Sequence, residues 1–321
     1  MRELTTDQLL QAFKQGDRRA CGQIMSLVED EAPAAQELLH RLYPDTGKAY
    51  RIGITGPPGG GKSSLVDKLA QACRQQQQTV GIVAVDPTSP FSGGAMLGDR
   101  VRMISLFLDR GVFIRSMGSR GSLGGLALNT TEVCDVLDAF GKDVIMIETI
   151  GVGQVELDIA GAAYTTVVVL VPESGDSIQA MKAGLMEVGD LFAINKSDRE
   201  GSDRMAMEVE AVLEMRSAQD GWHPRVVKTV ATEGKGVAEL MGLIWNHRAY
   251  LNQTGTLERR RRETAHQEVT ELVEGRLRAE LWRSPPVQAA LAAWLERIAA
   301  KKATPYQAAD AILEAWTRNA E

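Results

Sequence analysis

A glycine-rich loop at positions 56–63, with the sequence GPPGGGKS, constrains the fold of this chain more than any other feature. It follows an apolar run at 50–55 and precedes residues 64–70, whose apolar side chains recur at helical spacing. Glycines let successive backbone N–H groups surround a phosphate, and the positive end of the following helix adds to the attraction. The sequence therefore predicts a strand, a phosphate-binding loop and a helix in direct succession.

The residues of this loop have separate expected roles. Lys62 is expected to neutralise β- and γ-phosphate oxygens, and the Ser63 hydroxyl to hold Mg²⁺. A glycine-rich turn that happens to end in Lys-Ser is the alternative, and the strand and helix around it argue against that. The expected nucleotide contacts here are Gly56, Pro57, Pro58, Gly59, Gly60, Gly61, Lys62, Ser63 and Ser64.

A second motif, NKSD at positions 195–198, follows the apolar run 191–194 and matches the guanine-recognition signature NKxD. The Asp198 carboxylate would accept hydrogen bonds from guanine N1–H and the 2-amino group, which adenine does not offer, so ATP should be rejected. An ordinary Asn/Asp turn is the alternative. Residues 229–231 resemble the loop that offers a backbone N–H to guanine O6, although Val230 stands where serine is usual. The expected base contacts are Asn195, Lys196, Asp198 and Ala231.

Two further apolar runs end in carboxylates. The run 80–85 leads to Asp86, and the run 143–147 leads to Glu148 in the sequence ETIG, which takes the place of a DxxG motif. If both runs are parallel strands, their carboxyl ends meet the phosphate-binding edge of the sheet. The carboxylates would then serve Mg²⁺ or the attacking water, whereas a helix cap and a solvated strand end are the alternatives.

The segment 86–100, DPTSPFSGGAMLGDR, resembles the first switch of the MeaB/ArgK family, the G-protein chaperones of adenosylcobalamin-dependent acyl-CoA mutases. Residues 148–154, ETIGVGQ, resemble its second switch, and residues 175–184, GDSIQAMKAG, resemble its third. The resemblance begins near residue 16, extends to the NKSD motif and is weaker beyond it. It implies a Mg²⁺-dependent GTPase that converts GTP to GDP and phosphate, gates cofactor loading, and protects or reactivates a mutase.

The resemblance also implies roles for single residues. Asp86, Asp99 and Glu148 match the family's acidic residues that bind Mg²⁺ or position water, and Ser63 matches its magnesium hydroxyl. Gly151, the glycine of the second switch, is expected among the nucleotide contacts.

Two residues are candidates for assisting hydrolysis. Gln154 lies three positions past Gly151, not directly after it as in Ras-like proteins, so slow intrinsic hydrolysis is expected. Lys182 in the third switch is a candidate for stabilising transition-state charge when the mutase docks. A solvated helix lysine is the alternative for Lys182.

Composition narrows the class of protein and its setting. The chain has 321 residues and a formal net charge of −6, which argues against a general nucleic-acid binder. Its three cysteines are scattered without metal spacing, which favours a reducing cytoplasm. No signal peptide and no apolar run of about 18 residues is evident, so no membrane association is expected.

The expected fold class is α/β, a P-loop G domain with a doubly wound, mainly parallel sheet and helical additions at both ends. The expected segments are a helical extension at 1–47, the GTPase domain at 48–247 and a helical arm at 248–321. Thr5 and Asp17 are expected to cap the first two helices, and Pro305 to begin the last.

The apolar faces of the arm leave two possibilities open. They could pack on the nucleotide domain, while the resemblance favours a dimerisation arm and hence a homodimer. The arginine run at 259–262 could bind an acidic partner, but a solvated helix start flanked by Glu258 and Glu263 is favoured.

Two other functions are alternatives to the mutase chaperone. A metal-delivery GTPase of the nickel type would show clustered ligands, yet the four histidines are dispersed. A transport-associated ATPase or kinase conflicts with the NKSD motif. The sequence leaves open which acyl-CoA mutase would be the partner.

Overall fold

The computed structural model describes residues 5–86, 104–118, 125–149, 161–172, 184–215 and 221–317. The chain divides into two compact units, Met1–Thr264 and Ala265–Glu321.

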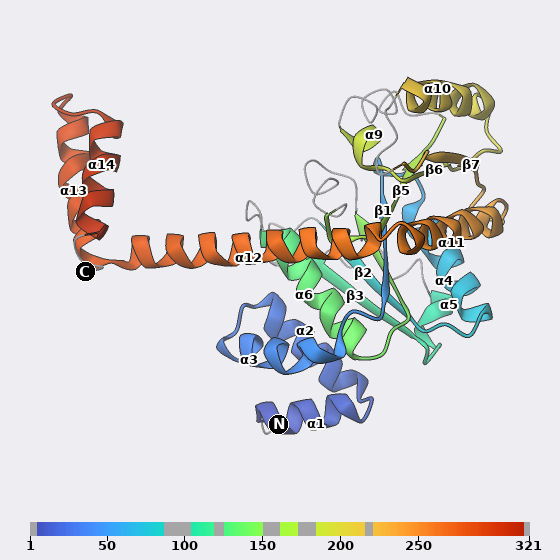
Figure 1. Cartoon of the computed structure of the whole chain (residues 1–321), viewed down its shortest axis with the longest axis horizontal. Coiled ribbons are helices and arrows are strands. Elements are labelled where there is room, and N and C mark those ends of the chain that lie inside the picture. The colour runs from blue at the N-terminus through green and yellow to red at the C-terminus, as the bar shows by residue number, and fades with distance from the viewer. Residues whose placement is uncertain are drawn as a thin grey trace. The chain divides into compact units, whose positions relative to one another are not determined.

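The first unit is built on a parallel sheet (Figure 1). Its described residues form seven strands in the order β3-β2-β4-β1-β5-β6-β7, and each neighbouring pair is parallel. Since β1 lies between β4 and β5, the direction of winding reverses beside it, and ligands bind at such a reversal in doubly wound folds. This confirms the predicted fold class. The strands are β1 Tyr50–Thr55, β2 Val80–Asp86, β3 Val112–Gly118, β4 Val144–Thr149, β5 Thr165–Leu170, β6 Leu191–Ile194 and β7 Arg225–Lys228.

Side chains of the central strands alternate between two apolar layers, as the two-residue period of a strand requires. On β4, Val144 and Met146 join the core beneath α4 (Lys62–Gln75) and α11 (Val237–Gln253). Ile145 and Ile147 point to the other face. Burial on both faces explains why these strands read as continuous apolar runs in the sequence.

Three N-terminal helices belong to the core of that second face. They are α1 (Thr6–Lys14), α2 (Arg18–Glu29) and α3 (Pro33–Leu42), and their apolar residues cluster with those of α6 (Gly125–Ala139) and of β2 to β4. Thr5 and Gln8 form the predicted capping box, and Asp17 caps α2 as predicted.

The chain that joins these helices to the sheet is held by one buried carboxylate. Asp138 of α6 accepts hydrogen bonds from the backbone N–H groups of Gly47, Lys48 and Ala49, at 2.8, 3.2 and 3.0 Å. Its side chain thus satisfies three donors immediately before β1.

The remaining helices of the first unit flank the strands on the β6 side and near β3. Residues of α9 (Leu185–Val188) and α10 (Ser202–Met215) form a separate apolar cluster with β5 and β6, while α5 (Ile104–Phe107) lies beside β3. None of the described helices combines the length and the apolar character that a membrane span requires.

The second unit is helical. The long helix α12 (Thr256–Arg283) begins in the first unit and continues into the second, where α13 (Pro285–Ala299) and α14 (Pro305–Thr317) pack on each other. Thr304 and Gln307 cap α14, and Pro305 is its first residue, as predicted. Five large apolar side chains of α12 are 39–60 % exposed, and one of them is Trp282 near its end. We call the other four the α12 stripe: Val269, Leu272, Val273 and Leu277.

Candidate nucleotide-binding site

The glycine-rich loop joins the carboxyl end of β1 to the amino end of α4, as predicted. Helix α4 begins at Lys62, whose side chain is only 5 % exposed. The Lys62 ammonium donates hydrogen bonds to the carbonyl oxygens of Gly56 and Pro57, at 2.7 and 2.9 Å. The loop thus holds a cation beside the helix N-terminus, where phosphate oxygens are favoured.

Two loop glycines are required by close neighbours. Gly56 has a φ of +133°, and a Cβ there would lie 2.1 Å from the carbonyl oxygen of Val169 in β5. Gly61 has a φ of +83°, and a Cβ there would lie 2.4 Å from the amide nitrogen of Asn195. The loop therefore lies directly against β5 and against the first residue of the NKSD motif.

The side chains expected to hold Mg²⁺ meet at the ends of neighbouring elements. The Ser63 hydroxyl of α4 donates to Glu148 Oε1 of β4 at 2.5 Å, and both side chains are buried. The register that places Ile54 opposite Glu148 brings this carboxylate beside the loop. A hydroxyl and a carboxylate are hard oxygen ligands of the kind Mg²⁺ prefers, so the pair fits that ion.

Asp86 is the last residue of β2, which runs beside β4. The strand end is therefore at the edge where Glu148 lies, as expected from the sequence. Across the described residues, no three carboxylate, imidazole or thiol side chains gather as a metal cluster. Mg²⁺ in nucleotide sites needs few protein ligands because phosphate oxygens and water supply the rest.

The base motif follows β6, and its asparagine links three loops. Asn195 donates from its side-chain nitrogen to the carbonyl of Gly60 at 2.8 Å. Its side-chain oxygen accepts from the Thr229 hydroxyl and from the Ala231 backbone N–H, each at 3.1 Å. Asn195 thus ties the phosphate loop to the 229–231 loop.

The structure places Ala231 differently from the sequence expectation in one respect. Its N–H, predicted for guanine O6, donates to the Asn195 side chain. Thr229 belongs to the predicted 229–231 loop but was not among the expected base contacts; it is buried and bonds to Asn195. Lys196 is half-buried with a φ of +56°, and Asp198 is exposed beyond it, so its carboxylate is accessible to a base.

Other predicted site residues cannot be placed in this arrangement. Asp99, Gly151, Gln154 and Lys182 lie outside the described residues, as does the side chain of Asp86. The described part brings together the glycine-rich loop, the buried Lys62, the oxygen atoms of Ser63 and Glu148, and the NKSD motif. Such a set can bind a nucleoside triphosphate and position its γ-phosphate for attack by water.

Comparison with known proteins decides the family. The profile described as "Methylmalonyl Co-A mutase-associated GTPase MeaB" matches residues 21–285. The chain belongs to the MeaB family. This MeaB-family protein is a GTPase of the P-loop class and binds guanine nucleotide, as its relatives' names also indicate.

Its relatives extend over nearly the whole chain. A Pyrococcus abyssi protein named as a GTPase is 48 % identical over 311 residues, which cover 96 % of each chain. The mouse protein "Methylmalonic aciduria type A homolog, mitochondrial" is 30 % identical over 328 residues, covering 97 % of this chain and 79 % of the mouse one. The crystal structure of a protein named "LAO/AO transport system kinase" superposes with a TM-score of 0.73 at 25 % identity and covers 98 % of both chains. The family resemblance, the fold class and the GTPase activity predicted from the sequence are thereby confirmed.

Proposed function

We propose that this MeaB-family GTPase is a chaperone of an adenosylcobalamin-dependent acyl-CoA mutase, and that GTP hydrolysis times its interaction with the mutase. The observation that carries the proposal is the family match, because the family's description names a GTPase associated with methylmalonyl-CoA mutase. In this role the protein gates cofactor loading and protects or reactivates its partner. The cobalamin chemistry belongs to the mutase.

The proposed roles of Lys62, Ser63 and Glu148 rest on their placement, and those of Asp86 and Asp99 rest on the family resemblance. Lys62 neutralises phosphate charge, and Ser63 and Glu148 would hold Mg²⁺ together with Asp86 and Asp99. When bound, Mg²⁺ supplies positive charge to the β- and γ-phosphate oxygens. Ser63 and Glu148 are buried, so bulk water would weaken their electrostatic interactions with Mg²⁺ less than at the protein surface.

The proposed base contacts are the Asp198 carboxylate and the loop that Asn195 fixes. Asn195 contacts both the phosphate loop and Ala231. A base bound at Asp198 would therefore be held at a fixed position relative to the phosphates of the same nucleotide. The structural neighbour is named as a transport kinase, and a metal-delivery function was a further alternative. No observation on the described residues favours either function over the guanine-nucleotide switch.

Hydrolysis by the protein alone is expected to be slow and to accelerate when the cognate mutase is added. The reason is that Gln154 is displaced in sequence from the usual water-orienting position, and Lys182 is proposed to approach the γ-phosphate on docking. Phosphate release at saturating mutase should show that Lys182→Ala keeps basal turnover and mutase binding but loses most of the stimulation.

Lys14→Ala provides a matched control, because Lys14 is an exposed lysine of α1 that pairs with Asp45. It should be stimulated like wild type. Full stimulation of Lys182→Ala would reject the role of that lysine, and absence of stimulation in wild type with every acyl-CoA mutase of the source cell would reject the chaperone proposal.

The α12 stripe supports a second part of the proposal, a homodimer formed through the C-terminal helices. Leu272 and Leu277 are 39 % and 45 % exposed. Val269, Val273 and Leu277 recur every four residues on this long helix, and Leu272 lies three residues after Val269, so the members are linked by helical spacing. A contiguous apolar stripe of this kind marks an association surface. The double substitution Leu272→Glu and Leu277→Glu should weaken the dimer at least about 100-fold, measured by light scattering across a dilution series.

Met207→Glu is the control for the dimer test, since Met207 is 66 % exposed on α10 of the first unit. It should leave the association constant unchanged. A monomeric wild type, or a dimer that tolerates both leucine substitutions, would contradict dimerisation through the α12 stripe.

A further inference from the structure

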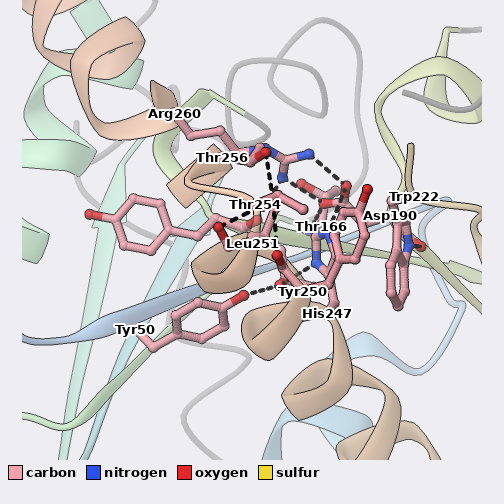
Figure 2. A network of polar contacts seen from close by, with 12 residues as sticks. Tyr50, Thr166, Asp190, Trp222, His247, Tyr250, Leu251, Thr254, Thr256 and Arg260 are labelled. Atoms are coloured by element: carbon pink, nitrogen blue, oxygen red, sulfur yellow. Dashed lines mark hydrogen bonds and ion pairs between the residues drawn. The ribbon is translucent and has the colours of Figure 1, made fainter. Parts of the chain in front are cut away.

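Figure 2 shows a network of polar contacts around Asp190, which lies at the other end of the sheet from the nucleotide site. It gathers at the amino ends of β1, β5 and β6, whereas the phosphate loop and NKSD motif follow the carboxyl ends of β1 and β6. The residues of this basal cluster are Tyr50, Thr165, Thr166, Asp190, Trp222, His247 and Arg260.

Asp190, directly before β6, is the centre of the basal cluster. Its Oδ2 accepts the backbone N–H of Thr166 at 2.8 Å, and its two carboxylate oxygens accept both terminal nitrogens of Arg260, at 3.0 and 3.2 Å. His247 Nε2 lies 3.5 Å from Oδ1, and the Trp222 indole donates to the Asp190 carbonyl at 3.0 Å. A two-pronged Arg–carboxylate pair of this kind fixes direction as well as distance.

The cluster continues from His247 into the centre of the sheet. His247 Nδ1 is 2.8 Å from the Thr165 hydroxyl, which lies 2.5 Å from the Tyr50 hydroxyl. Burial raises the pKa of Tyr50, so this phenol stays protonated and keeps its hydrogen bond. Thr165, His247 and Asp190 follow one another like a hydrolase triad, but all three are buried and no substrate could reach them. The cluster therefore links β1, β5, α11 and α12 to the residue before β6, and it does not act as a catalytic site.

Arg260 belongs to the arginine run 259–262 and differs from Arg259. Arg259 pairs with Glu263 of its own helix, as a solvated helix start predicts, whereas Arg261 pairs with Glu258 and also donates to the carbonyl of Gly47 at 2.8 Å. Arg260 instead is 20 % exposed, and it also donates to the carbonyl of Tyr164 at 2.6 Å. The solvated interpretation is therefore wrong for Arg260, which fastens the first turns of α12 to the sheet.

Two straight elements lead from the base-reading loops to the same carboxylate. Strand β6 has Asn195 directly after its carboxyl end and Asp190 directly before its amino end. Helix α11 begins directly after the 229–236 loop and carries His247 further along its length. A displacement of either loop along its element would therefore reach Asp190 and, through it, Arg260.

We propose that Asp190 and Arg260 form a latch that couples guanine recognition to the docking of the first turns of α12. Asp190 and Arg260 are positioning residues, since they act through β6 and α11 and touch no nucleotide. Bound guanine nucleotide fixes Asn195 and its loop. This holds the Asp190 carboxylate where it accepts hydrogen bonds from both terminal nitrogens of Arg260. Coupling is reciprocal, so a docked α12 also strengthens nucleotide binding. The proposal requires guanine-nucleotide binding alone and is independent of any mutase.

Hydrogen exchange on the full chain tests the latch directly. In wild type, saturating GDP is expected to slow exchange of the 256–264 amides about fivefold or more, within the usual range of coupling between sites. Arg260→Met keeps the apolar stem and removes the fork, so the nucleotide dependence of exchange should vanish. Because coupling is reciprocal, Arg260→Met should also raise the Kd for a fluorescent GDP analogue. The factor of this rise should not exceed the factor by which GDP slows exchange of the 256–264 amides in wild type.

Arg259→Met is the matched control, because Arg259 pairs with Glu263 on its own helix. It should keep both the GDP effect and the GDP affinity of wild type. If Arg260→Met does not fold, Arg260→Lys retains one charge and should show an intermediate coupling. The proposal would be overturned if GDP did not change the exchange rate of the 256–264 amides in wild type. It would also be overturned if the full GDP effect persisted in folded Arg260→Met.

Discussion

Lys62→Ala is expected to abolish productive GTP binding, whereas Glu148→Gln should bind GDP normally and lose about 10²–10³-fold of Mg²⁺-dependent turnover. Lys62 supplies the cation beside the loop carbonyls, so its loss leaves phosphate charge uncompensated. Glu148 contacts the Ser63 hydroxyl, so its loss should affect the metal-assisted step. Binding is measured with a fluorescent GDP analogue and turnover as phosphate release at saturating GTP.

The glutamine substitution keeps the shape of the buried Glu148 side chain and separates catalysis from folding. Glu208→Gln, on the exposed face of α10, serves as the control and should match wild type. Undiminished turnover in Glu148→Gln would remove this residue from the proposed metal site.

Guanine selectivity is expected to be the second large effect. GTP and GDP should bind at least about 100-fold more tightly than ATP and ADP, a difference of about 2.7 kcal/mol. Asp198→Asn removes the acceptor that pairs with the guanine 2-amino group, so xanthine nucleotides should gain affinity relative to guanine nucleotides. Calorimetric titrations of GDP, ADP and xanthosine diphosphate measure both effects.

The neighbouring exposed Asp203 offers a control for this substitution. Its carboxylate pairs with the Lys228 side chain at 2.5 Å, so Asp203→Asn should leave the base preference unchanged. Equal affinities for GDP and ADP in wild type would mean that the NKSD motif does not read the base.

The fold follows from local sequence patterns to a large extent. The phosphate loop, the buried apolar strands and the capping residues Thr5 and Asp17 each depend on neighbours within a few positions, and the structure confirms them. Glu148 reaches Ser63 because both motifs end at one edge of a parallel sheet, which topology rules also predict.

Contacts between distant loops could not be predicted in this way. The bonds from Asn195 to Gly60 and Thr229, and from Arg260 to Asp190, depend on strand order and register, and no local pattern encodes them. The domain boundary at 247/248 stays a prediction. The compact units divide after Thr264 because Leu257 and Arg260 of α12 already pack on the first unit.

The Asp138 bridge to residues 47–49 has a consequence for how the protein emerges from the ribosome. The three N–H groups and the carboxylate that accepts them are 89 to 91 positions apart in the chain. At elongation rates of about 5–20 residues per second, roughly 5–18 s pass between synthesis of residues 47–49 and synthesis of Asp138 in α6. The N-terminal helices cannot pack on α6 before then. During that interval Phe13 lacks Phe140, whose ring centroid lies 5.0 Å from its own in the finished protein. Part of the apolar surface of the N-terminal helices therefore stays exposed on the nascent chain until α6 has been synthesised.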